Sequence, residues 1–149
     1  MEVHNEDISG SVFENVNLRG SSFEDVIMRD CSFYLLDLTE ASFDDLCARA
    51  ASFNNVNLSR SQFTDVNFKE IVCQDCTFAG AVMDGVVLRN VKITNADIEG
   101  LEINGFNIRY LIEMMQTQLA DKARAELIEK AKAEARAEGA VRDLDLEEQ

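Results

Sequence analysis

Apolar residues recur at every fifth position through most of the chain. All 21 positions of this series, from Ile8 to Ile108, are apolar. A second apolar series lies two residues before the first. Its only polar members are Glu6, Ser11, Ser21 and Ser61. Neither the 3.6-residue period of a helix nor the two-residue alternation of a strand produces this spacing. The pattern therefore predicts a five-residue structural repeat.

The position two residues after each apolar centre has a composition of its own. Of its 21 occupants, 15 are Gly, Asn or Asp. These residue types tolerate left-handed backbone conformations and close tight turns. Each pentapeptide is therefore predicted to be a short extended segment followed by a corner. One such unit cannot bury its apolar side alone, whereas stacked units can, so the repeat predicts a solenoid.

Two longer periods predict how many corners make one coil. Phe alternates with smaller apolar residues from residue 13 to residue 58, a period of two pentapeptides. Basic residues recur at every twentieth position, at Arg29, Arg49, Lys69, Arg89 and Arg109. A coil of four pentapeptides has four faces, and the repeat region holds about five such coils. With a rise of about 4.8 Å per coil, the usual spacing of paired strands, the rod is about 24 Å long.

Several pentapeptides resemble a known repeat family. Examples are SSFED at 21–25, ASFDD at 41–45, ASFNN at 51–55, VNLSR at 56–60 and NADIEG at 95–100. They are similar to the A(D/N)LXX pattern of the pentapeptide-repeat family, over about two-thirds of the chain. The resemblance implies an all-β solenoid, a right-handed quadrilateral β-helix. The handedness comes from the family and not from the spacing.

The pattern divides the chain into four segments. Residues 1–7 are a lead-in before the β-helix of 8–108, and helix-forming residues predict a C-terminal α-helix over 109–138. Gly139 is a natural helix stop, and the acidic tail 139–149 is expected to be disordered. The first half of the helix is too apolar to stay uncovered. It is expected to cap the last coil, to form a homodimer, or both. The residues expected at a dimer interface are Leu111, Ile112, Met115 and Leu119.

Acidic residues are concentrated in the rod. The chain has a net charge of −14, and residues 1–108 hold 18 of its 28 acidic residues against 7 of its 14 basic ones. Four-sided geometry puts seven of these acids on the face centred on Phe23, Phe43 and Phe63. They are Glu24, Asp25, Asp44, Asp45, Asp65, Asp84 and Glu102. The net negative charge argues against direct binding of nucleic acid. A bland alternative is that the acids serve solubility, or pair with the bases four residues further on.

The sequence offers little for catalysis. His4 is the only histidine, and no nucleophile–base pair, phosphate-binding loop or metal-ligand cluster is present. Cys31, Cys73 and Cys76 fall on inward positions, so a structural interpretation of CQDC at 73–76 outweighs a metal or redox one. We therefore expect no enzyme activity, no catalytic residues, no cofactor and no metal. The acidic N-terminus and the lack of a long apolar run predict a cytoplasmic protein without a membrane partner.

Two functions of different classes remain open. The resemblance implies one of them, because acidic members of the family occupy the DNA-binding surface of topoisomerases such as DNA gyrase and dimerise through a C-terminal helix. In that case the acidic face is the partner-binding surface. The alternative is a scaffold that binds a partner unrelated to DNA. It would use the C-terminal helix and the outward apolar residues Val12, Tyr34, Leu35 and Val72, which share one face.

Overall fold

The chain forms two compact units that divide after Arg109. The structure is a computed structural model that describes the backbone of residues 1–147 and the side chains of residues 1–139. The first unit is a β-solenoid of about five coils, and the second is a single helix. The predicted fold class, an all-β solenoid with a C-terminal helix, is confirmed.

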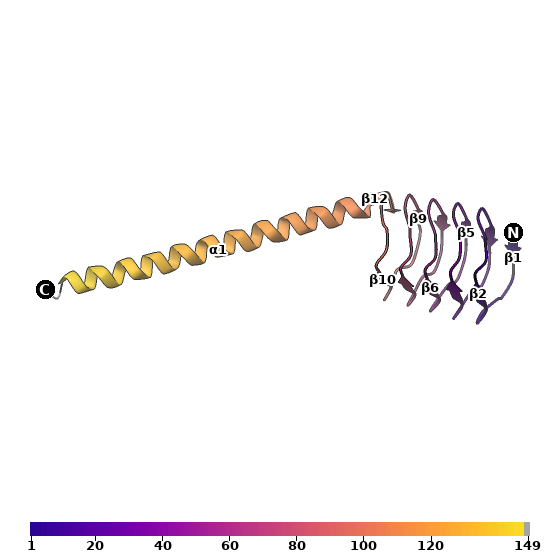
Figure 1. The fold of residues 1–149 in the computed structure, drawn as a ribbon, viewed down its shortest axis with the longest axis horizontal. Helices are drawn as coiled ribbons and strands as arrows, with labels where there is room; N and C mark the ends of the chain where they lie inside the picture. The colour runs from indigo at the N-terminus through magenta and orange to yellow at the C-terminus, as the bar shows by residue number, and fades with distance from the viewer. Residues whose placement is uncertain (148–149) are drawn as a thin grey trace. The chain divides into compact units, whose positions relative to one another are not determined.

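Each pair of successive pentapeptides contributes one short strand and one isolated bridge. The strands are β1 (Glu2–His4), β2 (Val12–Glu14), β3 (Ser22–Glu24), β4 (Ser32–Tyr34), β5 (Ser42–Asp44), β6 (Ser52–Asn54), β7 (Gln62–Thr64), β8 (Val72–Gln74), β9 (Val82–Asp84), β10 (Lys92–Thr94), β11 (Glu102–Ile103) and β12 (Phe106–Asn107). Odd-numbered strands make a seven-stranded sheet that ends in β12, and even-numbered strands make a five-stranded sheet. Figure 1 shows β5 and β9 along one side of the solenoid and β2, β6 and β10 along the other.

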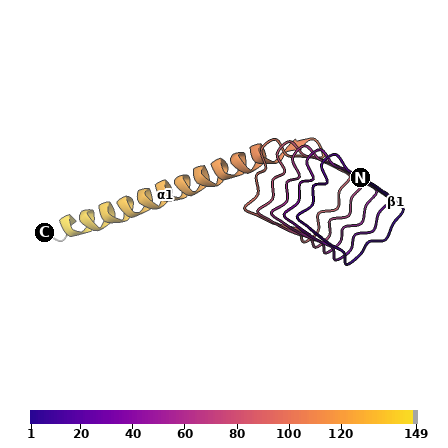
Figure 2. The same cartoon turned by 45° about the vertical axis from the view of Figure 1, so that its right-hand side comes forward.

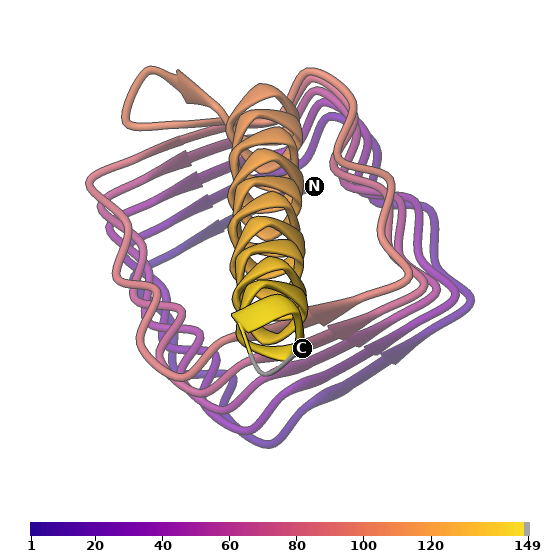
Figure 3. The same ribbon diagram turned by 90° about the vertical axis from the view of Figure 1, so that its left-hand side faces the viewer.

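Strands that neighbour each other within a sheet are parallel and one coil apart, except at the final pair of β11 and β12. Phe23 pairs with Phe43, and Phe43 pairs with Phe63. The isolated bridges build the other two sides, with Ile27 paired to Cys47 and Asn17 to Asp37. The solenoid is therefore four-sided, as Figure 3 shows along its axis and Figure 2 shows in an oblique view. The predicted coil of four pentapeptides is confirmed.

The corners lie where the sequence predicts them. Every position ending in 5 or 0 from Asn5 to Gly100 has a positive φ angle, as the left-handed conformation requires. From Asn5 to Gly80, the backbone N–H at each corner donates to a carbonyl one coil further on, for example Leu35 to Asn54 at 3.1 Å and Ala50 to Lys69 at 2.9 Å. Hydrogen bonding between coils thus keeps the corner residues in the left-handed conformation, even residues such as Leu35 and Ala50 that disfavour it.

The core is a stack of inward side chains. Phe13, Phe33 and Phe53 stack on one side, and Phe23, Phe43 and Phe63 stack on the other, with centroid separations of 4.6–5.1 Å. Phe43 is only 4% exposed. Parallel pairing puts equivalent residues of successive coils one above another, so a repeated Phe becomes a continuous apolar column.

The N-terminal boundary differs from the prediction of a lead-in over residues 1–7. Strand β1 pairs with β3, so Val3 is already in line with Phe23 and the solenoid begins at residue 2. Polar Glu6 obscured this register in the sequence. Strand β1 forms because its backbone pairs with that of β3 and because Val3 supplies an inward apolar side chain.

The last part of the predicted β-helix also differs from the expectation. The chain reverses at Asn104 and Gly105, and β12 pairs antiparallel with β11. Both turn residues have positive φ angles, 49° and 78°. Asn-Gly favours this two-residue hairpin turn over another coil corner. Phe106, expected on an inward position, is consequently 62% exposed.

The helix is longer than predicted. Helix α1 spans Ile108–Glu147, so it starts beside the expected Arg109 but passes through Gly139, and most of the expected disordered tail 139–149 is helical. Gly139 has no left-handed φ angle. A glycine inside a helix costs about 1 kcal/mol relative to alanine, which good helix formers on both sides can offset. Residues 148 and 149 lie outside the described part of the tail.

Candidate functional site

The seven predicted acidic residues do share one face, on the seven-stranded sheet. Glu24 pairs in register with Asp44, and the same column continues through Thr64 to Asp84. The corner that follows these strands carries a second column, Asp25, Asp45 and Asp65, and Glu102 lies on β11. All seven side chains are exposed. Neighbouring parallel strands are about 4.8 Å apart, so each column repeats at about that distance.

Few of these carboxylates are neutralised. His4 Nδ1 lies 3.2 Å from Glu24 Oε2, a contact that the sequence did not predict and that is an ion pair when the imidazole is protonated. The other six carboxylates make no ion pair with any described residue. The face therefore keeps most of its negative charge for a partner.

One glycine on this face makes room for an acidic neighbour. A Cβ atom at Gly85 would lie 2.3 Å from Asp65 Oδ1, closer than any real contact. Gly85 also has a φ angle of +64°, which favours glycine. The side chain of Asp65 thus lies over the corner of the next coil because that corner has no side chain.

The basic column lies on the next face of the solenoid and does not pair with the acidic corner. Arg49 Nε lies 3.3 Å from Glu70 Oε2, and Lys69 Nζ lies 3.4 Å from Glu70 Oε1. Hydrogen bonding from Arg49 lowers the pKa of Glu70 below its usual value. Within the described residues, no ion pair links Asp25, Asp45 or Asp65 to the base four positions later. The alternative in which these acids pair with the bases four residues further on is therefore wrong.

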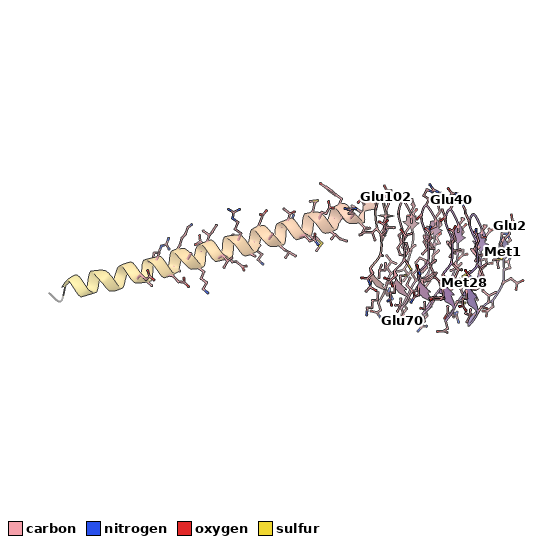
Figure 4. All side chains as sticks on the ribbon, viewed as in Figure 1. Met1, Glu2, Met28, Glu40, Glu70 and Glu102 are labelled. Atoms are coloured by element: carbon pink, nitrogen blue, oxygen red, sulfur yellow. The ribbon has the colours of Figure 1, made fainter. Side chains whose placement is uncertain are left out.

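A second ion-pair cluster lies on the opposite side of the solenoid. Glu40 accepts from Arg19 Nη2 at 3.2 Å and from Arg60 Nη2 at 2.9 Å, so it links three coils. Figure 4 shows Glu40 and Glu70 on opposite edges of the solenoid. The bases of the rod are thus engaged mainly by Glu40 and Glu70, which lie at other corners than Asp25, Asp45 and Asp65.

The apolar residues proposed for a scaffold share a face but are not contiguous. Val12, Tyr34, Leu35 and Val72 are 68%, 43%, 41% and 43% exposed. Val12 and Val72 belong to one column, in which Ser32 and Ser52 separate them. Only Tyr34 and Leu35 are adjacent.

A shallow groove lies beside this adjacent pair. Leu35 borders it, its volume is about 620 Å³, and polar corner residues such as Asn15, Asn55 and Asn95 line it. This groove was not predicted from the sequence, although the repeated Asn at one corner was a signal for it.

The cysteines behave as the sequence predicts. Cys31, Cys73 and Cys76 are buried, whereas Cys47 is half-buried on an outward position. The adjacent thiol of Cys76 and burial together raise the pKa of Cys73, so this thiol stays protonated. No group of three potential ligands that could hold a metal ion occurs in the part of the chain that the structure describes.

The helix by itself leaves its apolar residues open to solvent. Leu111, Ile112, Met115 and Leu119 are 38%, 41%, 61% and 64% exposed. A single helix cannot cover its own side chains, so this stripe is available to another surface. Further along, Glu129 and Lys132 form an ion pair at 3.0 Å, which is typical of a solvated helix surface.

Sequence comparison agrees with the repeat found in the structure. The family described as Pentapeptide repeats matches in eight copies, over residues 7–46 and 72–109. The chain is a pentapeptide-repeat protein. No curated protein matches the sequence.

Several solved structures align with this pentapeptide-repeat protein. One from the thylakoid lumen of Arabidopsis thaliana aligns with a TM-score of 0.63 at 26% identity, covering 66% of this chain and 68% of its own. The fluoroquinolone resistance protein QnrB1 aligns with a TM-score of 0.29 at 15% identity, covering 78% and 96%. HetL, which is involved in heterocyst differentiation in Nostoc, aligns with a TM-score of 0.23 at 12% identity, covering 72% and 89%.

Helix α1 of the pentapeptide-repeat protein is long but strongly charged. Among the described residues, no helix combines the length and the apolar character that crossing a bilayer requires.

Proposed function

We propose that this pentapeptide-repeat protein is a non-enzymatic protein-binding module. Its acidic face would dock on the DNA-binding surface of a DNA topoisomerase such as gyrase, in the cytoplasm. The observation that carries the proposal is the set of exposed carboxylates on the seven-stranded sheet, six of which have no ion-pair partner among the described residues. A surface that binds duplex DNA is basic and would attract such a face.

The spacing of the charges supports the same proposal. Coil 2 displays Glu24 and Asp25, and coil 3 displays Asp44 and Asp45. Two carboxylates per coil correspond to about one charge per 2.4 Å of axis if coils rise by about 4.8 Å. Duplex DNA carries one per about 1.7 Å. The densest part of the face thus approaches the linear charge density of the polymer that it would imitate.

A scaffold without any DNA-related partner is the second candidate. The exposed pair Tyr34 and Leu35 favours it, because Leu35 holds a left-handed φ angle of 54° at a corner where Asn, Asp or Gly costs less. A large apolar residue at a strained, exposed position is easier to understand if a partner covers it. In this candidate function the helix stripe Leu111–Leu119 would provide a second contact.

A supercoiling assay with gyrase tests the first candidate. The test variant changes Asp44, Asp45, Asp65 and Asp84 to Asn, which has nearly the same shape, suits the corner conformation of Asp45 and Asp65, and removes only charge. Wild-type protein at micromolar concentration should alter supercoiling, and the variant should lose this effect. The matched control changes Arg29, Arg49 and Arg89 to Gln and should keep or strengthen the effect.

The outcomes separate the two candidates. If wild-type protein neither binds gyrase nor alters supercoiling, that target is excluded and the scaffold function replaces it. A Leu35→Asn variant would then be tested for loss of whatever partner a pull-down recovers, since Asn relieves the corner strain and removes the apolar side chain.

A further inference from the structure

One side of the solenoid carries a mostly apolar column between two charged columns. The column consists of Ile27, Cys47, Asn67 and Val87, outward bridge residues that pair successively from coil to coil, and Asp7, which pairs with Ile27, precedes them. Val87 is 39% exposed and the other three are half-buried. We call this column the seam. Two outward apolar side chains in succession, Ile27 and Cys47, are unusual for a solvated wall.

The two borders of the seam have opposite charges. Two residues before the seam residues, at the corner, lie Asp25, Asp45 and Asp65, and two residues after them lie Arg29, Arg49 and Lys69. These six charged residues belong to three successive coils. One border of this side is therefore acidic, and the other carries three bases with Asp30 and Glu70 beside them, over the same length of the solenoid.

The borders do not neutralise each other within the chain. No ion pair crosses the seam among the described residues. Glu70 engages Arg49 and Lys69, but one carboxylate cannot use all the donors of a guanidinium and an ammonium group. Arg29 has no carboxylate at the equivalent corner one coil further on, because that position is Ala50. Both borders can thus accept further charged partners.

We propose that this side of the solenoid is a self-association surface that binds a second copy of the same chain. A two-fold axis parallel to the solenoid axis lays the seam of one copy on the seam of the other. The same rotation brings the acidic border of each copy against the basic border of its neighbour. A two-fold axis across the solenoid would instead oppose acid to acid, so electrostatics selects the parallel pair.

The repeat makes this match possible over three successive coils. Acidic and basic columns have the same period, one residue per coil, so Asp25 of one copy meets Arg29 of the other and the next two coils repeat the contact. The side is about 24 Å long and about 13 Å wide, or about 300 Å² per copy, against about 800 Å² for a standard interface. The association is therefore weak, and it strengthens with protein concentration and low salt.

The two-fold axis makes a specific prediction for Cys47. A residue on the seam faces its own equivalent in the second copy, so two Cys47 thiols come together, whereas Cys31, Cys73 and Cys76 are buried. Treatment of concentrated protein with diamide should then give a covalent dimer. The two thiols lose two electrons and two protons, one disulfide bond forms, and diamide is reduced to the hydrazine. A non-reducing gel measures the product, and Cys47→Ser should abolish it.

Matched variants distinguish docking from random collision of exposed thiols. In the Cys47→Ser background, Ile27→Cys restores a thiol on the seam and should cross-link. Thr77→Cys puts a thiol on the corresponding column of the opposite side and should not. Asp25→Lys should cut cross-linking of wild-type Cys47 about tenfold, because two exposed ion pairs become like-charge contacts. Adding Arg29→Glu to Asp25→Lys should restore it.

Three results with the wild-type protein and the seam variants would overturn the proposal, and a fourth comes from the helix variant described below. They are a wild-type protein that stays monomeric under diamide, equal cross-linking by Thr77→Cys, and no recovery in the double charge-reversal variant. Met115→Glu with Leu119→Glu removes any helix-mediated pairing, and cross-linking should persist in it; its loss would refute the seam as an interface of its own. None of these outcomes depends on gyrase, so they leave the proposed function to its own test.

Discussion

At the scale of single residues, the stacked rings of the core carry a large share of the stability. Phe43 is sandwiched between Phe23 and Phe63 at 5.1 and 4.8 Å. Phe43→Ala removes these contacts and leaves a cavity that neighbouring coils cannot fill. We expect the free energy of unfolding to fall by about 3–5 kcal/mol in a denaturant titration. A loss below about 1 kcal/mol, smaller than for any well-packed buried Phe, would show that the assigned register is wrong.

Two buried serines provide a matched pair of substitutions. Ser21 is 1% exposed and its hydroxyl has no hydrogen-bond partner among the described residues, whereas the Ser61 hydroxyl donates to the Leu58 carbonyl at 2.6 Å. Ser21→Ala should raise the free energy of unfolding by about 1–2 kcal/mol, because an unsatisfied buried hydroxyl is costly. Ser61→Ala should lower it by about 1 kcal/mol. Thermal melts of both variants check the sign, and equal effects would contradict the hydrogen-bond assignment.

The sequence predicted residue positions better than residue conformations at the corners. Gly, Asn and Asp indicate left-handed turns by their own preferences. Leu35, Glu40, Ala50, Arg60 and Glu70 adopt the same conformation, with φ angles of 54–64°. Their own chemistry does not favour it, and hydrogen bonds between coils impose it. The sequence indicates that these five residues are corners only because the five-residue period continues without interruption on both sides of them.

At the scale of elements, the interior of the solenoid followed from the sequence and its ends did not. Between the ends, each strand pairs with the equivalent strands of the coils before and after it, so the repeat determines its structure. At the N-terminus, β1 has a neighbour on one side only, and Glu6 hid its register. At the C-terminus, the turn preference of Asn104 and Gly105 outweighed the continuing apolar period. At the last coil no further coil stacks on the chain, so the conformational preference of the turn residues determines the structure there.

The helix carries the prediction for assembly. We expect a homodimer through Leu111, Ile112, Met115 and Leu119, because these exposed side chains form one apolar stripe. Met115→Glu combined with Leu119→Glu should remove this contact and shift sedimentation toward the monomer, while the far-UV β signal remains. Exposed Leu127→Glu, further along the helix and outside the stripe, is the matched control and should leave the assembly unchanged. A wild-type chain that is monomeric at high concentration would contradict the prediction.

At the scale of the whole molecule, the distribution of charge followed from the sequence, but the ion pairs did not. The period of four pentapeptides was enough to assign Glu24, Asp44 and Asp84 to one face. It could not reveal that Glu40 bridges two arginines or that Glu70 engages two bases, because those contacts depend on the reach of side chains across neighbouring coils. These contacts use other carboxylates than those of the acidic face, six of which have no ion-pair partner among the described residues.

Competition with DNA is the most direct measurement of the central claim that the acidic face imitates DNA. Fluorescence anisotropy of a labelled duplex bound to gyrase would be recorded as the protein is added. If the face imitates DNA, wild-type protein displaces the duplex and the effect weakens steeply with salt, whereas the variant with Asp44, Asp45, Asp65 and Asp84 changed to Asn does not displace it. Unchanged anisotropy with wild-type protein, or equal displacement by the variant, would contradict the claim.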